Sequence, residues 1–314
     1  MAEPIAFVSR SAQTERDNWL KVLSENLVDE KIVDFNDLKP ADYDMIELAI
    51  VANPDPDQLK KLTNLKWIQS LWAGVERMVK ELPENAPPIV RLVDPALTEA
   101  MAEAVLAWTL YLTRDMPRYH RQQQERLWQP HSYKPASQWK IGLLGLGQLG
   151  RAAAKLLTLT GFQVNGWSKS QKTLDNVTCL SGKAGFIRLI ETSDIVVLLI
   201  PLTKETTGLL GKNEFAHMKK GASLINFSRG PVIDTDALVD ALNKHELDHA
   251  VLDVFDQEPL PPDSPLWQNE NITVLPHISA PTNKESAAKI VAKNIAHWRK
   301  TGKLPPVVNR IRGY

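Results

Sequence analysis

The sequence predicts an α/β protein composed of two doubly wound domains, each built on a parallel sheet. Short apolar runs alternate with helical stretches along the 314-residue chain, and this alternation is typical of parallel sheets covered by helices. A glycine-rich segment, Gly145-Leu146-Gly147-Gln148-Leu149-Gly150, opens a second series of such units. The length also suits two domains, since a domain commonly holds about 150 residues.

The first domain is expected to contain residues 1–98 and 284–314. The strands predicted from apolar runs lie at residues 4–9, 45–51, 65–70 and 89–93. A helix is expected at residues 14–27, before the second of these strands. The last helix, 284–301, follows the final strand of the chain and is expected to return to the first domain.

The second domain is expected at residues 99–283 and begins with a helix at 99–116 that has few helix-breaking residues. A further helix is predicted at 150–160, and strands are predicted at 141–144, 162–167, 195–200, 223–226, 251–254 and 273–275. Residues 117–137 are polar and have no clean period, and this segment is too long for a simple loop inside a compact domain. We interpret it as an arm that packs on a partner subunit.

Composition argues against several classes of protein. The 37 Lys and Arg residues balance the 37 Asp and Glu residues, so no basic excess favours nucleic acid or an anionic membrane. The only cysteine, Cys179, cannot form an internal disulfide, and no Cys/His cluster has the spacing of a metal site. The apolar run at 195–200 is too short to span a bilayer, and no secretory signal is visible at the N-terminus. We expect a cytoplasmic protein without a bound metal.

The glycine segment has the sequence context of a dinucleotide-binding loop. It follows the apolar run 141–144 and opens a helix, as this motif requires. Gly145 permits a tight turn, Gly147 lets the backbone approach a diphosphate, and Gly150 lets the helix pack against the strand. The diphosphate would lie at the N-terminus of the helix, where unpaired N–H groups favour negative charge. Glycines that serve only a strand–helix turn are the alternative.

The residues after the next strand indicate which dinucleotide is bound. NAD-binding chains usually place Asp or Glu roughly 20 residues after the glycines, where it bonds the ribose 2′-hydroxyl. This chain instead has Trp167-Ser168-Lys169-Ser170, and its next acidic residue is Asp175. A carboxylate would repel a 2′-phosphate, whereas a hydroxyl and an ammonium can bind it. We therefore predict that NADP(H) is preferred and NAD(H) is possible; solvent-facing turn residues are the alternative.

Three ionisable residues each stand at or just past the C-terminal end of an apolar run: Arg229, Glu258 and His277. An arginine can bind a carboxylate through two hydrogen bonds and polarise a ketone. A histidine can donate the proton that a developing alkoxide needs, and a glutamate can orient the imidazole and favour its charged form. Taken singly, Arg229 could bind backbone at a helix start and Glu258 could be a solvated turn residue. Together they predict hydride transfer to a 2-keto acid.

These motifs resemble those of the D-isomer-specific 2-hydroxyacid dehydrogenases, and within that family those of the A-type glyoxylate/hydroxypyruvate reductases. The resemblance covers almost the whole chain from about Trp67 and is densest between Ile141 and Pro281. The segments that support the A-type subgroup are 167–170, 250–255, 258–267 and 312–314. The resemblance implies a Rossmann-type dinucleotide-binding domain at 99–283, a substrate-binding domain at 1–98 with 284–314, and an active-site cleft between them.

The resemblance also assigns roles to individual residues. It makes Arg229, Glu258 and His277 the catalytic set, with Arg229 and His277 in contact with both substrate and cofactor. The cofactor residues that it implies, besides the glycine segment and Ser168-Lys169-Ser170, are Met101, Pro201, Leu202, Thr206, Phe227, Ser228 and Asp253. Asp253 is assigned to the nicotinamide carboxamide. In the first domain the backbone of Trp72-Ala73-Gly74-Val75 is assigned to the substrate carboxylate, with a tight turn after a strand as the alternative.

The activity implied by the resemblance is the NADP(H)-dependent reduction of glyoxylate or hydroxypyruvate to glycolate or D-glycerate, by a homodimer. Many relatives carry Gly-Ala-Gly-Val-Asp where this chain has Trp72-Ala73-Gly74-Val75-Glu76. An indole beside the substrate changes the pocket, so a bulkier keto acid such as phenylpyruvate is the alternative substrate. Trp128, in the arm, is a candidate to close the pocket from the partner subunit, and core or surface packing is its alternative.

Two other functions are disfavoured by particular positions. Formate dehydrogenases share the fold, but they need an amide before the histidine, where this chain has Pro276. An NAD(H)-sensing corepressor, an interaction protein rather than an enzyme, would carry an acidic residue near Ser168 and long docking tails. Neither feature is present in the sequence.

Overall fold

The computed structural model describes residues 3–310. The chain divides into two compact units, Met1–Ala96 with Thr282–Tyr314, and Leu97–Pro281. The sequence analysis placed the two boundaries slightly further along the chain, after residues 98 and 283. The segment 312–314, which was used to identify the A-type subgroup, lies outside the described residues.

The first unit contains a five-stranded parallel sheet in the order β2-β1-β3-β4-β5. Its strands are β1 (Ile5–Ser9), β2 (Ile32–Asp34), β3 (Leu48–Ala52), β4 (Trp67–Ser70) and β5 (Ile89–Val90). The four strands predicted from apolar runs are present, while β2 was not predicted. β2 has only three residues, lies at the edge of the sheet and is half-buried, so it lacks a long apolar run.

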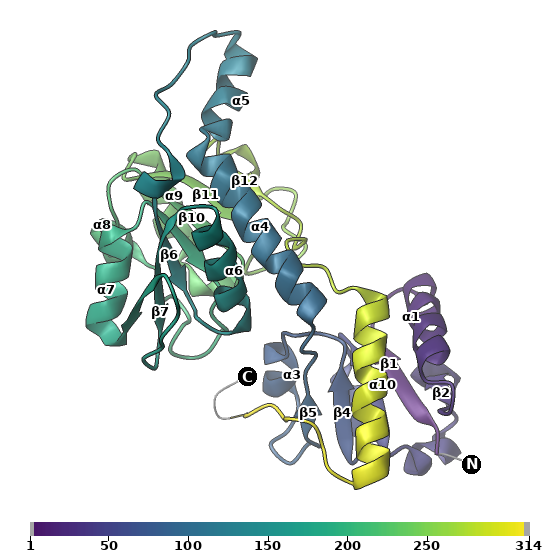
Figure 1. Ribbon diagram of the computed structural model, residues 1–314. Helices are drawn as coiled ribbons and strands as arrows, with labels where there is room; N and C mark the ends of the chain where they lie inside the picture. Colours follow the sequence, from purple (N-terminus) through teal and green to yellow (C-terminus); the bar gives the residue numbers. More distant parts are fainter. Residues whose placement is uncertain (1–2, 311–314) are drawn as a thin grey trace. The chain divides into compact units, whose positions relative to one another are not determined.

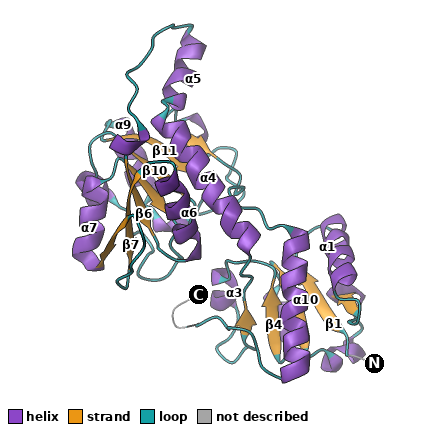
Figure 2. Ribbon diagram, viewed as in Figure 1, coloured by secondary structure: helices purple, strands orange, loops and turns teal. Residues whose placement is uncertain are grey.

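Helices cover both faces of this sheet (Figures 1 and 2). The elements are α1 (Gln13–Asn26), α2 (Pro56–Lys61), α3 (Glu76–Glu81) and α10 (Lys284–Thr301), with short 3₁₀ turns at Phe35–Asp37 and Pro40–Met45. α1 and α10 bury apolar side chains against one face, and α2 and α3 cover the other. α10 has the predicted bounds because both ends carry clear signals: Asn283 caps the first turn through Ser286 N–H, and Gly302 ends the helix at φ +67.

The second unit contains a seven-stranded parallel sheet in the order β12-β11-β10-β9-β6-β7-β8. Its strands are β6 (Lys140–Leu144), β7 (Gln163–Ser168), β8 (Val177–Ser181), β9 (Ile195–Leu198), β10 (Ala222–Asn226), β11 (Leu247–Leu252) and β12 (Ile272–Val274). The order reverses beside β6, so the glycine loop that follows β6 lies where doubly wound sheets bind ligands. The edge strand β8 was not predicted, because it is only half-buried and contains Thr178 and Cys179.

Two groups of helices cover the faces of this sheet. The helices are α4 (Pro95–Thr113), α5 (Met116–Glu125), α6 (Gln148–Leu159), α7 (Gly182–Thr192), α8 (Lys212–His217) and α9 (Thr235–Asn243), with 3₁₀ turns at Ala136–Gln138, Gly230–Val232 and Pro265–Gln268. α4 and α6 pack on one face, and α7, α8 and α9 pack on the other. Within residues 3–310 no helix combines the length and apolar character needed to cross a bilayer.

The segment 117–137 contains a helix that the sequence analysis did not identify. α4 ends at Thr113, the chain turns at Asp115 with φ +55, and α5 then begins. α5 buries only Pro117 and Gln122, so it has no apolar stripe from which to predict it. Figure 1 shows α5 and the loop after it extending away from the sheet of the second unit.

Candidate active site

The loop after β6 has the shape of a diphosphate cradle. Gly145 has φ +115, and a Cβ there would lie 2.7 Å from the carbonyl oxygen of Leu199. At Gly150 a Cβ would lie 1.8 Å from the carbonyl oxygen of Gly145, so α6 starts in direct contact with the turn. At Gly147, by contrast, a Cβ would meet no atom within 4 Å, and no side chain caps the helix. The open side of the loop therefore exposes the first N–H groups of α6, including those of Gln148 and Leu149, and fits a diphosphate.

The end of β7 lies beside this loop, since Gly145 N–H donates to the carbonyl oxygen of Trp167, and Ser168, Lys169 and Ser170 carry no acidic side chain. Ser168 Oγ donates a hydrogen bond to the carbonyl oxygen of Ser170 over 2.7 Å, while Lys169 and Ser170 are exposed. The pKa of Glu205 lies below its usual range because Thr203 donates to it and because Lys169 and Lys204 are close. Lys169 therefore lies near the loop after β9, and the exposed segment carries a positive charge and no carboxylate.

The remaining residues assigned to the cofactor are held by local contacts. Thr206 Oγ donates to the carbonyl oxygen of Pro201 and accepts the N–H of Thr203, both over 2.7 Å, which closes the loop after β9. Leu202, in the same loop, packs against the core beneath it. Met101 is buried in the core that α4 shares with α6.

The loop that carries Arg229 is organised by Asn226, the last residue of β10. The Asn226 carboxamide oxygen accepts the Ser228 N–H at 3.0 Å and the Ser228 hydroxyl at 2.7 Å. Its amide nitrogen donates to the carbonyl oxygen of Arg229 over 3.1 Å. The half-buried Arg229 donates through one guanidinium nitrogen to the carbonyl oxygen of Ser228, and Phe227 and Ser228 are buried. The sequence analysis missed Asn226; an asparagine that ends a buried strand just before the arginine is the signal that could have identified it.

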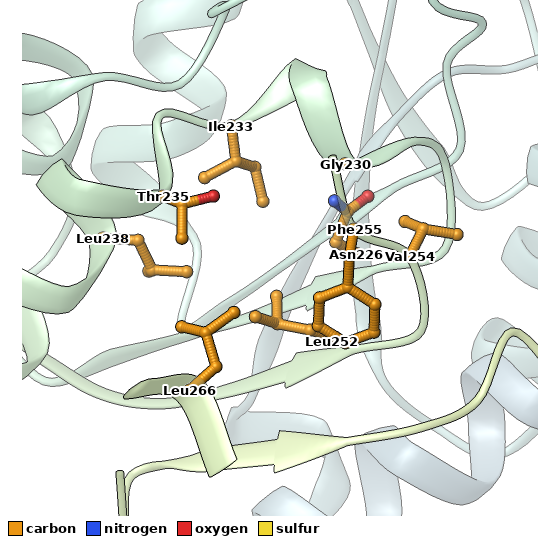
Figure 3. Close-up of a pocket in the computed structure, with 9 residues that line it drawn as sticks. All are labelled: Asn226, Gly230, Ile233, Thr235, Leu238, Leu252, Val254, Phe255 and Leu266. Carbon is orange, nitrogen blue, oxygen red and sulfur yellow. The ribbon is translucent and has the colours of Figure 1, made fainter. Parts of the chain in front are cut away.

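A small pocket lies behind the arginine loop (Figure 3). Its lining comes from β10, β11, α9 and the turns beside them: Asn226, Gly230, Ile233, Thr235, Leu238, Leu252, Val254, Phe255 and Leu266. Its volume of about 10 Å³ has room for about one water molecule. None of the lining side chains is ionisable, so this pocket offers no acid or base chemistry.

Glu258 and His277 form a hydrogen-bonded pair. His277 Nδ1 lies 2.7 Å from one Glu258 carboxylate oxygen, and the N–H of Phe255 donates to the other over 3.0 Å. The His277 side chain is 50% exposed and the Glu258 side chain 36% exposed. The second ring nitrogen of His277 is therefore available to a ligand, while the first is oriented by the carboxylate.

The electrostatics of the pair favour its charged form. The hydrogen bond that His277 donates to the Glu258 carboxylate raises the pKa of His277, against the opposing effects of partial burial and the charge of Arg229. Partial burial acts to raise the pKa of Glu258. This effect is outweighed by the hydrogen bonds that the carboxylate accepts from His277 and from Phe255 N–H, and by the charges of His277 and Arg229, so the pKa of Glu258 is lowered. Arg229 thus lies close enough to act on both partners. The structure brings the three predicted residues together within one unit.

Asp253 holds the main chain that carries His277. Its two carboxylate oxygens accept the N–H groups of Ile278, at 2.7 Å, and Ser279, at 3.1 Å, and its side chain is buried. His277 itself has φ +51. The sequence analysis assigned Asp253 only to the nicotinamide and missed this contact, because the partners lie 25 and 26 residues further along the chain. Each oxygen retains a lone pair for a carboxamide donor.

The predicted substrate loop lies at the end of β4 in the first unit. The N–H of Trp72 donates to Ser70 Oγ over 3.0 Å, and its indole packs edge-on against Trp19 with ring centres 5.9 Å apart. The half-buried Ala73 and Gly74 follow, and no hydrogen bond between described residues uses their N–H groups. These two N–H groups are available to an anion. Across residues 3–310 no cluster of three His, Cys, Asp or Glu side chains could hold a metal ion.

Comparisons with known proteins agree with this geometry. Residues 106–279 match the family model for the D-isomer specific 2-hydroxyacid dehydrogenase, NAD binding domain. Glyoxylate/hydroxypyruvate reductase A from Serratia proteamaculans is 34% identical over 307 residues, covering 95% of this chain and 96% of the relative. The same enzyme from Yersinia enterocolitica is 34% identical and covers 96% and 97% of the two chains.

Solved structures give the same result. A D-isomer specific 2-hydroxyacid dehydrogenase from Xanthobacter autotrophicus Py2, in complex with NADPH and MES, aligns over 100% of both chains with a TM-score of 0.91 and 34% identity. An NADPH-dependent glyoxylate/hydroxypyruvate reductase from Sinorhizobium meliloti, in complex with NADP and sulfate, aligns over 99% of this chain and 100% of that one, with a TM-score of 0.88 and 28% identity. The chain therefore belongs to the family of D-isomer specific 2-hydroxyacid dehydrogenases, which are oxidoreductases.

Proposed function

We propose that this chain reduces a small 2-keto acid, glyoxylate or hydroxypyruvate, to the D-2-hydroxy acid with NADPH as the reductant. The observation that carries the proposal is the hydrogen-bonded His277–Glu258 pair with Arg229 close to both partners, in the unit that holds the glycine loop. The names of the similar reductases from Serratia and Yersinia support this choice of substrate.

The proposed roles follow from charge and hydrogen-bonding capacity. Arg229 binds the substrate carboxylate and polarises the ketone oxygen. His277, whose pKa is raised by the Glu258 carboxylate, donates a proton to the oxygen as negative charge develops on it. The N–H groups of Ala73 and Gly74, in the first unit, are the proposed second anchor for the carboxylate. When bound, the nicotinamide supplies the hydride.

The proposed cofactor site uses the residues of the second unit. The first turn of α6 holds the diphosphate, and Ser168, Lys169 and Ser170 hold the 2′-phosphate of NADP(H). The proposed contacts of the nicotinamide half are Met101, Pro201, Leu202, Thr206, Phe227, Ser228, Arg229, Asp253 and His277. Two similar structures were solved with NADPH or NADP, and this supports the same preference here.

A panel of keto acids and cofactors tests the activity. Glyoxylate, hydroxypyruvate, pyruvate and phenylpyruvate would each be assayed with NADPH and with NADH. We expect the highest kcat/KM with glyoxylate or hydroxypyruvate and NADPH. His277→Ala should lower kcat by roughly 10²–10⁴-fold, the usual contribution of a positioned acid. A preference for phenylpyruvate would overturn the substrate class, and near-normal turnover by His277→Ala would overturn the assigned acid.

We also propose that the enzyme is a homodimer formed through the arm. The large apolar and aromatic residues exposed at the end of α4, at the start of α5 and in the arm are Leu110 (41%), Met116 (44%), Tyr119 (36%), Leu127 (48%), Trp128 (98%) and Tyr133 (68%). Local contacts hold this surface in one conformation. His131 forms hydrogen bonds with Gln122 and Tyr119, and the Arg114 guanidinium lies over the Tyr133 ring. An ordered apolar surface of this kind favours a protein partner, and a zero net charge adds no self-repulsion between copies.

Sedimentation at micromolar concentration tests the proposed dimer. The wild-type protein should sediment as a dimer, and Trp128→Ser should shift it towards monomer. Trp267→Ser is the matched control, since Trp267 is also exposed (52%) but lies outside the arm, and it should remain dimeric. A monomeric wild-type protein would contradict the proposal.

A further inference from the structure

The loop after β7 is tied to the edge strand β8 by the side chain of Gln171. The Gln171 amide nitrogen donates to the carbonyl oxygens of Cys179, at 3.2 Å, and Lys172, at 3.3 Å. The amide oxygen accepts the hydroxyl of Ser181 at 2.7 Å. The amide nitrogen and the amide oxygen of Gln171 therefore each form a hydrogen bond with a residue of β8, Cys179 and Ser181 respectively.

The start of the same loop is fixed independently. Ser168 pairs with Ser181 in the β7–β8 ladder. The indole N–H of Trp167 donates to the carbonyl oxygen of Gly182 over 2.9 Å, and its ring packs edge-on against Phe186. The chain is thus anchored on both sides of Lys169 and Ser170, whose side chains are exposed.

We propose that Gln171 is a positioning residue that determines selectivity for NADPH over NADH, by holding Lys169 and Ser170 in the geometry that binds the 2′-phosphate. The proposal rests on the NADP(H) site described above. A loop that is ordered before binding loses less conformational entropy when it receives a ligand. Gln171 is neutral and need not touch the phosphate, so its contribution is the order of the loop.

The effect of Gln171 is expected to be confined to one part of the cofactor. NADPH and NADH differ only in the 2′-phosphate, whereas the diphosphate of both binds at the start of α6. The contacts of Gln171 reach β8 and its own loop only. Loss of these contacts therefore loosens the phosphate-binding residues without moving the glycine loop or the catalytic residues.

Gln171→Ala tests the proposal. The residue is exposed, so the variant should fold. We expect the KM for NADPH to rise by about three- to tenfold, the size expected from losing a few neutral hydrogen bonds. The Kd of 2′,5′-ADP, measured by calorimetry, should rise by the same factor. The KM for NADH, the Kd of 5′-AMP and kcat should not change. Ser181→Ala, which removes one of the three bonds, should give a smaller shift in the same direction.

Gln163→Ala is the matched control. Gln163 lies at the other end of β7 and donates through its side chain to the carbonyl oxygen of Ser137, so the same atoms are deleted away from the phosphate site. An equal change for NADPH and NADH in Gln171→Ala, no change in either, or the same selective loss in Gln163→Ala would each overturn the proposal.

Lys169→Ala, assayed in parallel, separates this proposal from the one on which it rests. If Lys169→Ala lowers the preference for NADPH while Gln171→Ala does not, the positioning role alone is wrong. If Lys169→Ala leaves the preference unchanged, the 2′-phosphate site itself is wrong, and the role of Gln171 is overturned with it.

Discussion

A Cβ atom on Gly230 would lie 2.1 Å from the carbonyl carbon of Phe255, so the loop after Arg229 and the loop before Glu258 touch main chain to main chain. Gly230 and Phe255 both line the pocket in Figure 3. Phe255 also donates its N–H to Glu258, and Glu258 bonds His277. The close approach at Gly230 therefore sets the spacing between the Arg229 loop and the Glu258–His277 pair.

Gly230→Ala should separate these loops and lower kcat by about tenfold or more, since a displacement of about 1 Å can cost 10²-fold in rate. The measurement is kcat for keto acid reduction, with thermal unfolding to show that the variant folds. Gly211→Ala is the control, because a Cβ there meets no atom closer than 3.6 Å. A folded Gly230→Ala variant with wild-type kcat would show that the spacing is not critical.

Asp253→Asn tests whether the buried carboxylate holds the loop of His277. The amide keeps the size of the side chain but can place only one acceptor oxygen against two N–H donors, those of Ile278 and Ser279. We expect kcat to fall by roughly tenfold or more and the loop to gain mobility, measured as faster amide hydrogen exchange at Ile278. The exposed Asp248 lies on β11, the strand that ends just before Asp253, and it supplies the control variant Asp248→Asn. Unchanged exchange at Ile278 would refute the anchoring role.

The pKa shifts of the pair set the expected pH dependence. Reduction needs protonated His277, so kcat/KM should hold at low pH and fall as pH rises through the raised pKa of His277. Glu258→Gln removes the carboxylate that raises this pKa, so the fall should begin at lower pH. Glu191→Gln is the control, since it removes the partner of the exposed His217 instead. The same midpoint in Glu258→Gln and wild type would contradict the proposed coupling.

The same pKa shifts predict the pH range in which the Glu258–His277 pair stabilises the fold. The contribution of His277, whose pKa is raised, is complete at low pH and is lost as pH rises through the raised value. The contribution of Glu258, whose pKa is lowered, is complete at higher pH and is lost as pH falls through the lowered value. The loss of unfolding free energy in Glu258→Gln, measured with urea, should therefore be largest between the two pKa values. A loss of equal size at every pH would assign it to packing rather than to charge.

Local patterns predicted the fold and identified the candidate catalytic residues, and long-range contacts account for most of what they missed. The apolar runs and the caps of α10 are local, and so is the glycine loop that opens α6. The edge strands β2 and β8 and the exposed helix α5 bury too few apolar side chains to give a regular spacing of apolar residues in the sequence. The bonds from Asp253 to Ile278 and from Gln171 to Ser181 join residues brought together only by the sheet. Residue types suggest such contacts, but only the folded chain identifies the partners.

His277 occupies the left-handed region of backbone conformation, which costs a residue with a side chain roughly 1–2 kcal/mol. The residue that we propose as the proton donor therefore weakens the fold that holds it. His277→Gly and His277→Ala should both lower kcat by the same roughly 10²–10⁴-fold. The glycine variant should nevertheless have the higher unfolding free energy, by about 1 kcal/mol, because glycine adopts this conformation without strain. Chemical denaturation of the two variants measures the difference, and equal stability would show that the strain is relieved elsewhere. At this one position activity and stability favour different residues.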